Sequence, residues 1–317
     1  MKINEAFWSR VQSWAQERGY RVAAADISLL EEVRSALEKR LRAGEIEPGF
    51  YQENLSSFTY LEGCPIKKPR SVILIAVPLP ATILTFAFGG KKIETILPPT
   101  YVRYRKLFEE VRDDLREALS GLNCRLELLS APLKILANRM GLISYGRNNI
   151  GYIDGIGSYF QLVGLVSDKR FGKKSLPAMP AEPLLPRCRD CRICAAACPT
   201  GAIDRERILL HAEKCYTLFS ESPNPIPEHL NPPSPRCLIG CLRCQELCLE
   251  NKGLLRYEET AVSFDAEETA AFLGMTPAAG LAFERAQEKF QTLGLTEGLP
   301  VFARNLKRML RIRGDVK

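Results

Sequence analysis

Cysteines are the residues of this chain whose spacing points most directly to chemistry. Nine of the eleven cysteines lie between Cys188 and Cys248. In the first run, CRDCRICAAACP, two residues separate each of the first three cysteines, three residues precede the fourth, and Pro199 follows. Thiolates at this spacing bind 4Fe–4S clusters: three of them wrap one cluster, and the fourth points away to ligate another. The sequence therefore predicts two clusters, which together make an electron relay.

A second run, CLIGCLRCQELC at residues 237–248, supplies the matching ligands, because Cys241, Cys244 and Cys248 repeat the spacings of two and three residues. Exchange of the fourth cysteine gives two ligand sets: Cys188, Cys191, Cys194 and Cys248 for cluster one, and Cys198, Cys241 and Cys244 plus one more for cluster two. Spacing leaves Cys215 and Cys237 as alternatives for the last place. A zinc site would use two C-x2-C pairs and leave too many cysteines without a role.

Composition indicates a globular protein from a reducing compartment. The 317 residues are 46% hydrophobic and 26% charged, and the net charge of +7 is a mild excess that does not by itself indicate nucleic-acid binding. Clustered cysteines in a reducing compartment favour metal ligation over disulfides, and the distant Cys64 and Cys124 are interpreted as core thiols. Residues 1–26 lack a signal-peptide core, and Pro78 and Pro80 interrupt the uncharged stretch 71–90. We therefore expect a cytoplasmic protein without a membrane partner.

The elements that position the cysteines follow from hydrophobic spacing. The pattern predicts helices over 7–17 and 101–119, a strand, a loop and a second strand within 71–90, and loops around short strands over 141–164. The Pro-rich stretch 171–187 is typical of a linker, and helices are predicted from about residue 256 onward. The last helix places Phe302, Leu306, Met309 and Leu310 on one face and Arg304, Lys307, Arg308 and Arg311 on the other. We interpret the basic face as solvated rather than as an anion site.

Several segments resemble the epoxyqueuosine reductases, a family of cobalamin-dependent tRNA-modifying enzymes related to reductive dehalogenases. In the cysteine-rich region, the similar segments are CPTGAI (198–203), KCYTLFSE (214–221) and IGCLRCQELCLEN (239–251). Upstream, GLISYGRNN (141–149) is similar to the family's Gly-rich loop, and GSYFQLVG (157–164) is similar to a second segment of that family. RSVILIAVPLP (70–80) resembles the strand that opens the family's cobalamin domain.

The resemblance implies an α+β fold in three parts. These are a nitroreductase-like α/β domain for cobalamin and substrate (1–180), a bacterial ferredoxin-like module with two 4Fe–4S clusters (181–255), and a short helical C-terminal segment (256–317). The resemblance also implies that Cys215 is the eighth ligand and that Cys237 is spare. It further implies an external low-potential donor of ferredoxin or flavodoxin type for cluster one, and transfer from cluster two to the corrinoid.

The residues that the resemblance implies for cobalamin binding lie in two Gly-containing segments: Gly141, Tyr145, Gly146, Asn148, Asn149, Gly157 and Ser158. The two asparagines are equally well interpreted as residues that stabilise a turn. His211 and His229 are the only histidines. Neither lies in the first 180 residues, so we expect a base-off corrinoid without a histidine ligand from that region.

The sequence departs from the family at the proton donor. The position of the family's catalytic Asp is Leu129, which cannot donate a proton. We therefore predict a divergent paralogue with a different, unidentified substrate, and assign the acid role to Tyr145, whose pKa the Arg147 guanidinium would lower. Tyr152 and Tyr159 are rivals, and simple packing of these tyrosines is the alternative. Two other functions remain open: an electron-transfer protein that reduces a partner's corrinoid or another acceptor, and a tRNA epoxyqueuosine reductase with a relocated acid.

Overall fold

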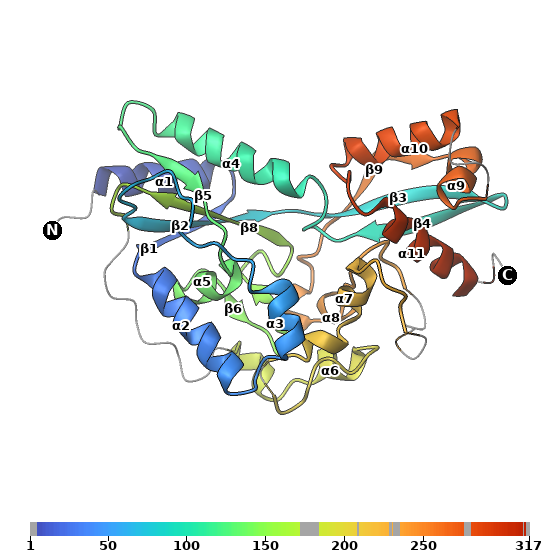
Figure 1. Cartoon of the computed structure of the whole chain (residues 1–317), viewed down its shortest axis with the longest axis horizontal. Coiled ribbons are helices and arrows are strands. Elements are labelled where there is room, and N and C mark those ends of the chain that lie inside the picture. Colours follow the sequence, from blue (N-terminus) through green and yellow to red (C-terminus); the bar gives the residue numbers. More distant parts are fainter. Residues whose placement is uncertain are drawn as a thin grey trace. The chain divides into compact units, whose positions relative to one another are not determined.

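The chain divides into two compact units in a computed structural model (Figure 1). The structure describes residues 5–171, 184–207, 209–227, 230, 235–275, 280–312 and 314. The first unit consists of Met1–Pro78 and Lys106–Cys191, and the second consists of Leu79–Arg105 and Arg192–Lys317.

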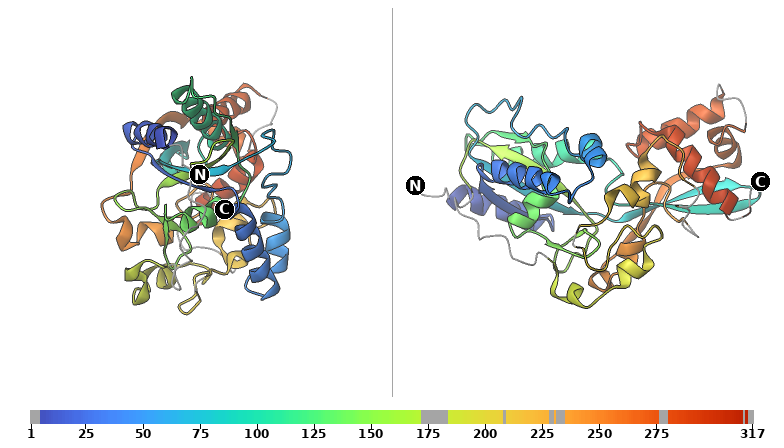
Figure 2. Two further views of the ribbon diagram at one scale, coloured as in Figure 1. Left: turned by 90° about the vertical axis from the view of Figure 1, so that its left-hand side faces the viewer. Right: turned by 60° about the horizontal axis from the view of Figure 1, so that its bottom comes forward.

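The first unit is built on a four-stranded antiparallel sheet in the order β1-β2-β8-β5. Its strands are β1 (Arg21–Asp26), β2 (Ser71–Pro78), β5 (Leu126–Leu128) and β8 (Phe160–Ser167). Helices α2 (Leu29–Arg42) and α5 (Leu133–Arg139) lie on one face, and α1 (Glu5–Glu17) and α4 (Tyr104–Ala118) lie on the other (Figures 1 and 2). Strand β2 is apolar along nearly its whole length because both faces of the sheet are covered. The unit also contains α3 (Pro48–Asn54) and a short hairpin of β6 (Ser144–Tyr145) and β7 (Gly151–Tyr152).

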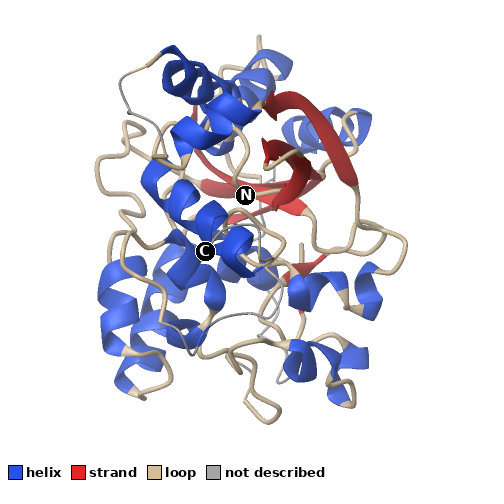
Figure 3. Ribbon diagram, turned by 90° about the vertical axis from the view of Figure 1, so that its right-hand side faces the viewer, coloured by secondary structure: helices blue, strands red, loops and turns tan. Residues whose placement is uncertain are grey.

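The second unit contains a three-stranded sheet in the order β4-β3-β9, formed by β3 (Ala81–Phe88), β4 (Lys91–Leu97) and β9 (Tyr257–Phe264). Its helices are α9 (Ala266–Phe272), α10 (Leu281–Thr292) and α11 (Leu299–Ile312) (Figures 1 and 3). They contribute to one apolar core with β3, β4 and β9. Aromatic rings form the centre of this core. The ring centroids of Phe86 and Phe264 lie 4.5 Å apart, and those of Phe272 and Phe290 lie 4.7 Å apart.

Short helices carry or adjoin the cysteines. They are the 3₁₀ helices η1 (Pro186–Arg189), η2 (Ala212–Lys214) and η4 (Leu249–Asn251), and the α-helices α6 (Ile193–Ala197), α7 (Tyr216–Glu221) and α8 (Arg243–Glu246). The boundary between the two units falls between Cys191 and Arg192, within the first cysteine run.

Most of the predicted elements are confirmed. Helices α1 and α4 lie where the apolar spacing placed them, and the uncharged stretch 71–90 contains β2 and β3 separated by Leu79 and Pro80. The prediction of helices from residue 256 onward was wrong for Tyr257–Phe264, which form β9 parallel to β3. Alternation of exposed and more buried residues toward the end of that segment is typical of a strand at the edge of a core.

The two compact units are also divided differently from the predicted three domains. The β3–β4 hairpin belongs to the second unit, although it lies within the range 1–180 that was predicted as one domain. The C-terminal helices are not a separate part, because Phe86 and Leu84 of the hairpin share a core with Phe290 and Phe302. Of the predicted linker 171–187, only Phe171 and residues from Leu184 onward lie within the described residues, and His229 lies outside them.

Candidate iron–sulfur site and Gly-rich loop

Five of the predicted ligand cysteines gather in the second unit. The thiol of Cys244 lies within electrostatic range of the thiols of Cys194, Cys198, Cys215 and Cys241. Cys241 interacts in the same way with Cys215 and Cys198. The four cysteines that the resemblance implies for cluster two therefore lie near one another, although they come from three separate stretches of sequence.

Cys237 occupies a different place from Cys215. Of the described thiols, Cys241 alone is among the main electrostatic neighbours of Cys237. Its backbone extends the second unit's sheet: Ile96 donates to the Arg236 carbonyl at 2.9 Å, and Leu238 donates to the Ile96 carbonyl at 2.9 Å. Cys237 is thus a buried residue beside a strand. Cys215, in contrast, is half-buried and caps the N-terminus of α7.

Burial shapes the acidity of these thiols. It raises the pKa of Cys241 to about 11 and also raises the pKa of Cys215. Hydrogen bonds from the backbone of Arg243 and Thr217 act in the opposite direction, because they favour the thiolate. Bound iron deprotonates a coordinating thiol outright, so these pKa values describe the site before metal binding.

Among the described residues, no group of three or more His, Cys, Asp or Glu side chains has the geometry to hold one metal ion. Zinc holds each sulfur at about 2.3 Å, so its ligands crowd around one point. The four irons of a cubane instead place their cysteine sulfurs at separate corners. The reason to expect clusters is the spacing of the cysteines in the sequence.

Two buried polar residues connect the segments that carry Cys215 and Cys241. The Nδ2 of Asn305 in α11 donates to the Ser220 carbonyl and to the Leu238 carbonyl, both at 2.9 Å. The Oγ of Ser220 accepts from the backbone N–H of Gly240 at 2.8 Å. Sequence reasoning missed Asn305 and Ser220. Asn305 lies three residues after Phe302 and four before Met309, so its position on the buried face of α11 was the available signal.

The basic residues of α11 are partly engaged inside the unit. Arg304 donates to the carbonyls of Ser222 at 2.7 Å and Phe219 at 3.1 Å, and it also bonds those of Ser220 and Asn224. Arg308 donates to the Ile226 carbonyl at 3.3 Å. The prediction of a solvated basic face was therefore wrong for these two arginines, which satisfy carbonyls at and beyond the C-terminus of α7.

The Gly-rich loop of the first unit is held by its own side chains. Asn148 Nδ2 donates to the Tyr152 hydroxyl at 2.8 Å, and Asn148 Oδ1 accepts from the Ile150 N–H at 3.3 Å. Lys134 Nζ donates to both the backbone and the side-chain oxygen of Asn149, at 2.8 and 3.2 Å. Gly146 is required here, because a Cβ would lie 2.6 Å from Asn148 Oδ1 and 2.6 Å from the Tyr152 ring. Both asparagines thus stabilise the loop.

The predicted catalytic pair is not arranged as expected. The Arg147 guanidinium is buried and donates from Nε and Nη2 to the Cys188 carbonyl, at 3.3 and 2.9 Å. Burial raises the pKa of Tyr145. The guanidinium that acts in the opposite direction is that of Arg40, and its effect is the smaller one. The expected lowering by Arg147 was therefore wrong. The rivals Tyr152 and Tyr159 are buried, as are Gly157 and Ser158, whereas Gly141 is exposed.

Leu129 lies in the apolar core of the first unit. Its side chain packs in the cluster that contains Leu136 and Phe160, and its backbone N–H donates to the Gly164 carbonyl at 2.9 Å. A Cβ on Gly164 would lie 2.5 Å from Leu133, so this part of the core is closely packed. The residue that the resemblance places at the family's acid position is therefore a packing residue.

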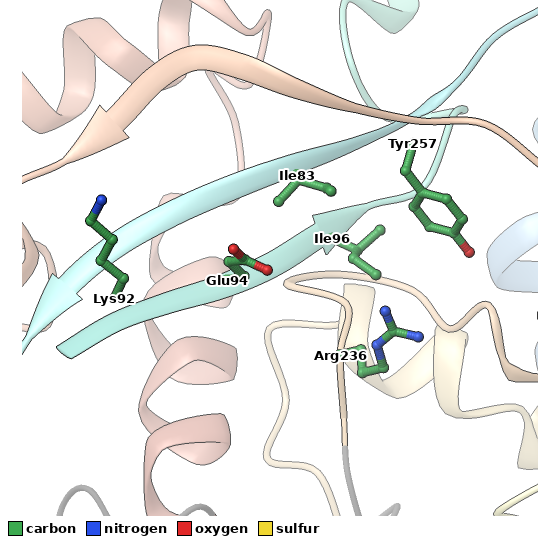
Figure 4. A pocket seen from close by; sticks show the side chains of 6 residues that line it. All are labelled: Ile83, Lys92, Glu94, Ile96, Arg236 and Tyr257. Atoms are coloured by element: carbon green, nitrogen blue, oxygen red, sulfur yellow. The ribbon is translucent and has the colours of Figure 1, made fainter.

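A pocket of about 370 Å³ lies on the sheet of the second unit (Figure 4). Its lining combines two isoleucines with four polar side chains: Ile83, Lys92, Glu94, Ile96, Arg236 and Tyr257. Arg236 Nη1 and the Tyr257 hydroxyl each bond Glu246 Oε1 at 3.0 Å, which connects one end of the pocket to α8. None of the predicted site residues lines it.

Comparisons with known proteins support the resemblance seen in the sequence. Residues 187–251 match a family described as 4Fe-4S double cluster binding domain. The chain is 25% identical to the epoxyqueuosine reductase of Aliivibrio fischeri over 276 residues, which cover 80% of this chain and 69% of that protein. It is also 25% identical to the epoxyqueuosine reductase of Pseudomonas aeruginosa over 328 residues, which cover 95% of this chain and 82% of that protein.

Solved structures share the fold. The epoxyqueuosine reductase of Streptococcus thermophilus superposes with a TM-score of 0.71 at 18% identity, and covers 99% of this chain and 82% of its own. An epoxyqueuosine reductase in complex with a tRNA-Tyr epoxyqueuosine-modified stem loop gives a TM-score of 0.72 at 17% identity, with 99% and 83% covered. Within the described residues, no helix combines the length and apolar character needed to span a membrane. The chain is therefore a relative of the epoxyqueuosine reductases, which are oxidoreductases, and it carries a double 4Fe–4S cluster binding domain.

Proposed function

We propose that the chain is a cobalamin-dependent iron–sulfur reductase with two 4Fe–4S clusters and a substrate that is not yet identified. The observation that carries the proposal is the gathering of Cys198, Cys215, Cys241 and Cys244 in a region that matches a double-cluster domain. These four are the proposed ligands of cluster two. The proposed ligands of cluster one are those given by the sequence spacing: Cys188, Cys191, Cys194 and Cys248.

The chain's own residues hold and shield cluster two. Leu238 and Leu242 lie within the second cysteine run and are almost fully buried, and we propose that they limit the access of water to the cluster. Backbone N–H groups that bond the Cys215 and Cys241 sulfurs stabilise negative charge there. Burial and such hydrogen bonds are among the factors that set cluster potentials. When bound, the clusters supply one-electron carriers, and cobalamin supplies a cobalt centre for two-electron reduction.

The Gly-rich loop fits cobalamin in part. Gly141 has φ +71°, is exposed, and has no atom within 4 Å of the place where a Cβ would stand, so a flat ligand has room to approach its backbone. The amides of Asn148 and Asn149 already bond within the loop. We therefore propose that any contact with cobalamin uses backbone groups and the Tyr145 ring more than these amides, and we derive no reaction step through the cofactor.

A proton donor remains part of the proposal. Tyr145 is half-buried, and Lys134 Nζ lies 5.9 Å from its ring centroid. Because burial raises the pKa of Tyr145, the hydroxyl stays protonated at neutral pH and keeps a proton to donate. Arg147 is proposed to act on the loop and on Cys188 rather than on this hydroxyl.

One observation favours a second candidate function. Leu129, which the resemblance places at the position of the family's acid, is an apolar core residue. A protein that only transfers electrons to a partner needs no proton donor at that position. The tRNA-modifying alternative receives less support than the sequence suggested. Arg304 and Arg308, which contributed to the basic face, bond carbonyls within the second unit.

The testing experiment is anaerobic reconstitution with iron and sulfide, followed by titration with cobalamin. We expect about eight irons per chain and a base-off cobalt signal in the electron paramagnetic resonance spectrum. About eight irons without cobalamin binding would support the electron carrier instead. About four irons would contradict the two-cluster ligand assignment.

A further inference from the structure

Arg147 places a permanent positive charge against the backbone of a proposed cluster ligand. Only 6% of the residue is exposed, and its guanidinium donates two hydrogen bonds to the Cys188 carbonyl. Arginine stays charged at every pH that proteins experience. Burial of a charge is costly unless hydrogen bonds and opposite charge compensate it. A 4Fe–4S cluster with four thiolate ligands is anionic when oxidised and more so when reduced, so a cluster held by Cys188 would interact favourably with this charge.

The loop is fixed against the same stretch of chain. The Leu185 N–H donates to the Tyr145 carbonyl at 2.8 Å, and Tyr145 forms a β-bridge with Leu184. Together with the two bonds from Arg147, these contacts join residues 145–147 to residues 184–188. All of them lie within the first unit. The position of the guanidinium relative to Cys188 is therefore set by backbone pairing and not by a mobile side chain alone.

We propose that Arg147 is a positioning residue for the cluster that Cys188 helps to bind, and that its charge raises the reduction potential of that cluster. The inference rests on the proposed function, because it needs a cluster at Cys188. Reduction adds one negative charge to a 4Fe–4S cluster, and a nearby buried cation stabilises the reduced form more than the oxidised form. Net charge, hydrogen bonding and exposure are the means by which proteins tune such potentials.

The test is a redox titration of the reconstituted chain, followed by electron paramagnetic resonance. In Arg147→Gln, we expect the ratio of reduced to oxidised cluster at a fixed potential to fall about tenfold for one cluster. For a one-electron couple, this equals a decrease of about 59 mV in the reduction potential of that cluster. The other cluster should keep its potential. Arg147→Lys should keep most of the wild-type potential, because the positive charge remains. The control is Arg139→Gln, which removes an arginine of the same unit that pairs with Glu32 at 2.8 Å.

The outcomes separate this inference from the proposed function. Eight irons with unchanged potentials in Arg147→Gln would overturn the inference and leave the reductase proposal intact. Equal shifts in Arg147→Gln and Arg147→Lys would overturn the charge effect. If Arg147→Gln does not bind the cluster, the test uses Arg147→Lys. A cluster potential in Arg147→Lys that differs from the wild-type value would overturn the charge effect, and an equal potential is the expected result. A wild-type chain without iron would overturn the proposed function and the inference together.

Discussion

Asn305 tests whether α11 holds the two segments that carry Cys215 and Cys241. In Asn305→Leu, the side chain keeps a similar size but loses both bonds from Nδ2, to the Ser220 and Leu238 carbonyls. The Ser220 carbonyl retains a bond from Arg304 at 3.3 Å. Among the described residues, Asn305 is the one side chain that donates to the Leu238 carbonyl, and Leu238 is fully buried.

The magnitude follows from these contacts. Each hydrogen bond contributes about 1 kcal/mol net, and a buried carbonyl left without a partner costs about 1–3 kcal/mol. The substitution should therefore destabilise the second unit by about 2–4 kcal/mol. At a urea dependence of about 2 kcal/mol per molar, the middle of the typical range, the unfolding midpoint should fall by about 1–2 M. Cluster two should also be lost before cluster one, because Cys215 and Cys241 would no longer be held together.

The assay combines anaerobic urea unfolding, followed by circular dichroism, with iron content after reconstitution. The control is Gln291→Leu, which makes a comparable amide-to-leucine change at an exposed site on α10 of the same unit. We expect about four irons in Asn305→Leu and about eight in the control. If both variants unfold at the same urea concentration and bind the same iron, α11 does not hold the cluster segments and the reasoning is refuted.

Four further predictions follow from single residues. Cys215→Ser should reduce iron from about eight to about four atoms per chain, whereas Cys237→Ser should keep about eight; the opposite pattern would exchange their roles. Tyr145→Phe should lower reduction of a small epoxide, used as a surrogate substrate, by about 10²–10⁴-fold with iron and cobalamin binding unchanged, and unaltered turnover would exclude it as the acid. Gly146→Ala should destabilise the chain by about 1–3 kcal/mol in thermal unfolding, because its Cβ would overlap Asn148 Oδ1 and the Tyr152 ring; an unchanged midpoint would mean that the loop opens easily. Backbone N–H groups lower the pKa of Glu47 below 4.5, so its cap on α3 stabilises above that pH and is lost as pH falls through the folded-state value; Glu47→Ala should lose stability at neutral pH and converge with the wild type in acid.

Local covalent geometry explains which parts of the site could be predicted. The spacing of Cys188, Cys191 and Cys194 is set by how a short chain wraps a cubane. A cluster at these residues could therefore be predicted without knowledge of the fold. The choice between Cys215 and Cys237 is not local. The proposal of Cys215 is supported by two long-range features: β4 pairs with the Cys237 backbone through Ile96, and Cys215, at the start of α7, lies near Cys241. Only the resemblance pointed to Cys215 at the sequence level.

The contacts that could not be predicted join residues far apart in the chain. Arg147 reaches Cys188 across 41 positions, and Asn305 reaches Ser220 across 85. The sequence shows that a buried Arg or Asn needs hydrogen-bond partners. It does not show which carbonyl groups are those partners. Strand β9 was missed for a related reason. Its pairing with β3 is parallel and long-range, and helices follow it directly, so the local pattern was dominated by its helical neighbours.

The environment of Tyr145 restricts the chemistry that the proposed reductase can serve. Tyr145 is half-buried and burial raises its pKa, so its hydroxyl is suited to a step in which a strongly basic group forms. Reduction that generates an alkoxide or a carbanion meets this requirement, whereas reduction that releases a weakly basic anion needs no acid at all. If Tyr145→Phe slows a substrate of the first kind and leaves one of the second kind unaffected, Tyr145 replaces the acid that Leu129 cannot supply. If neither substrate responds, the apolar core at Leu129 is better explained by a protein that transfers electrons and leaves proton chemistry to its partner.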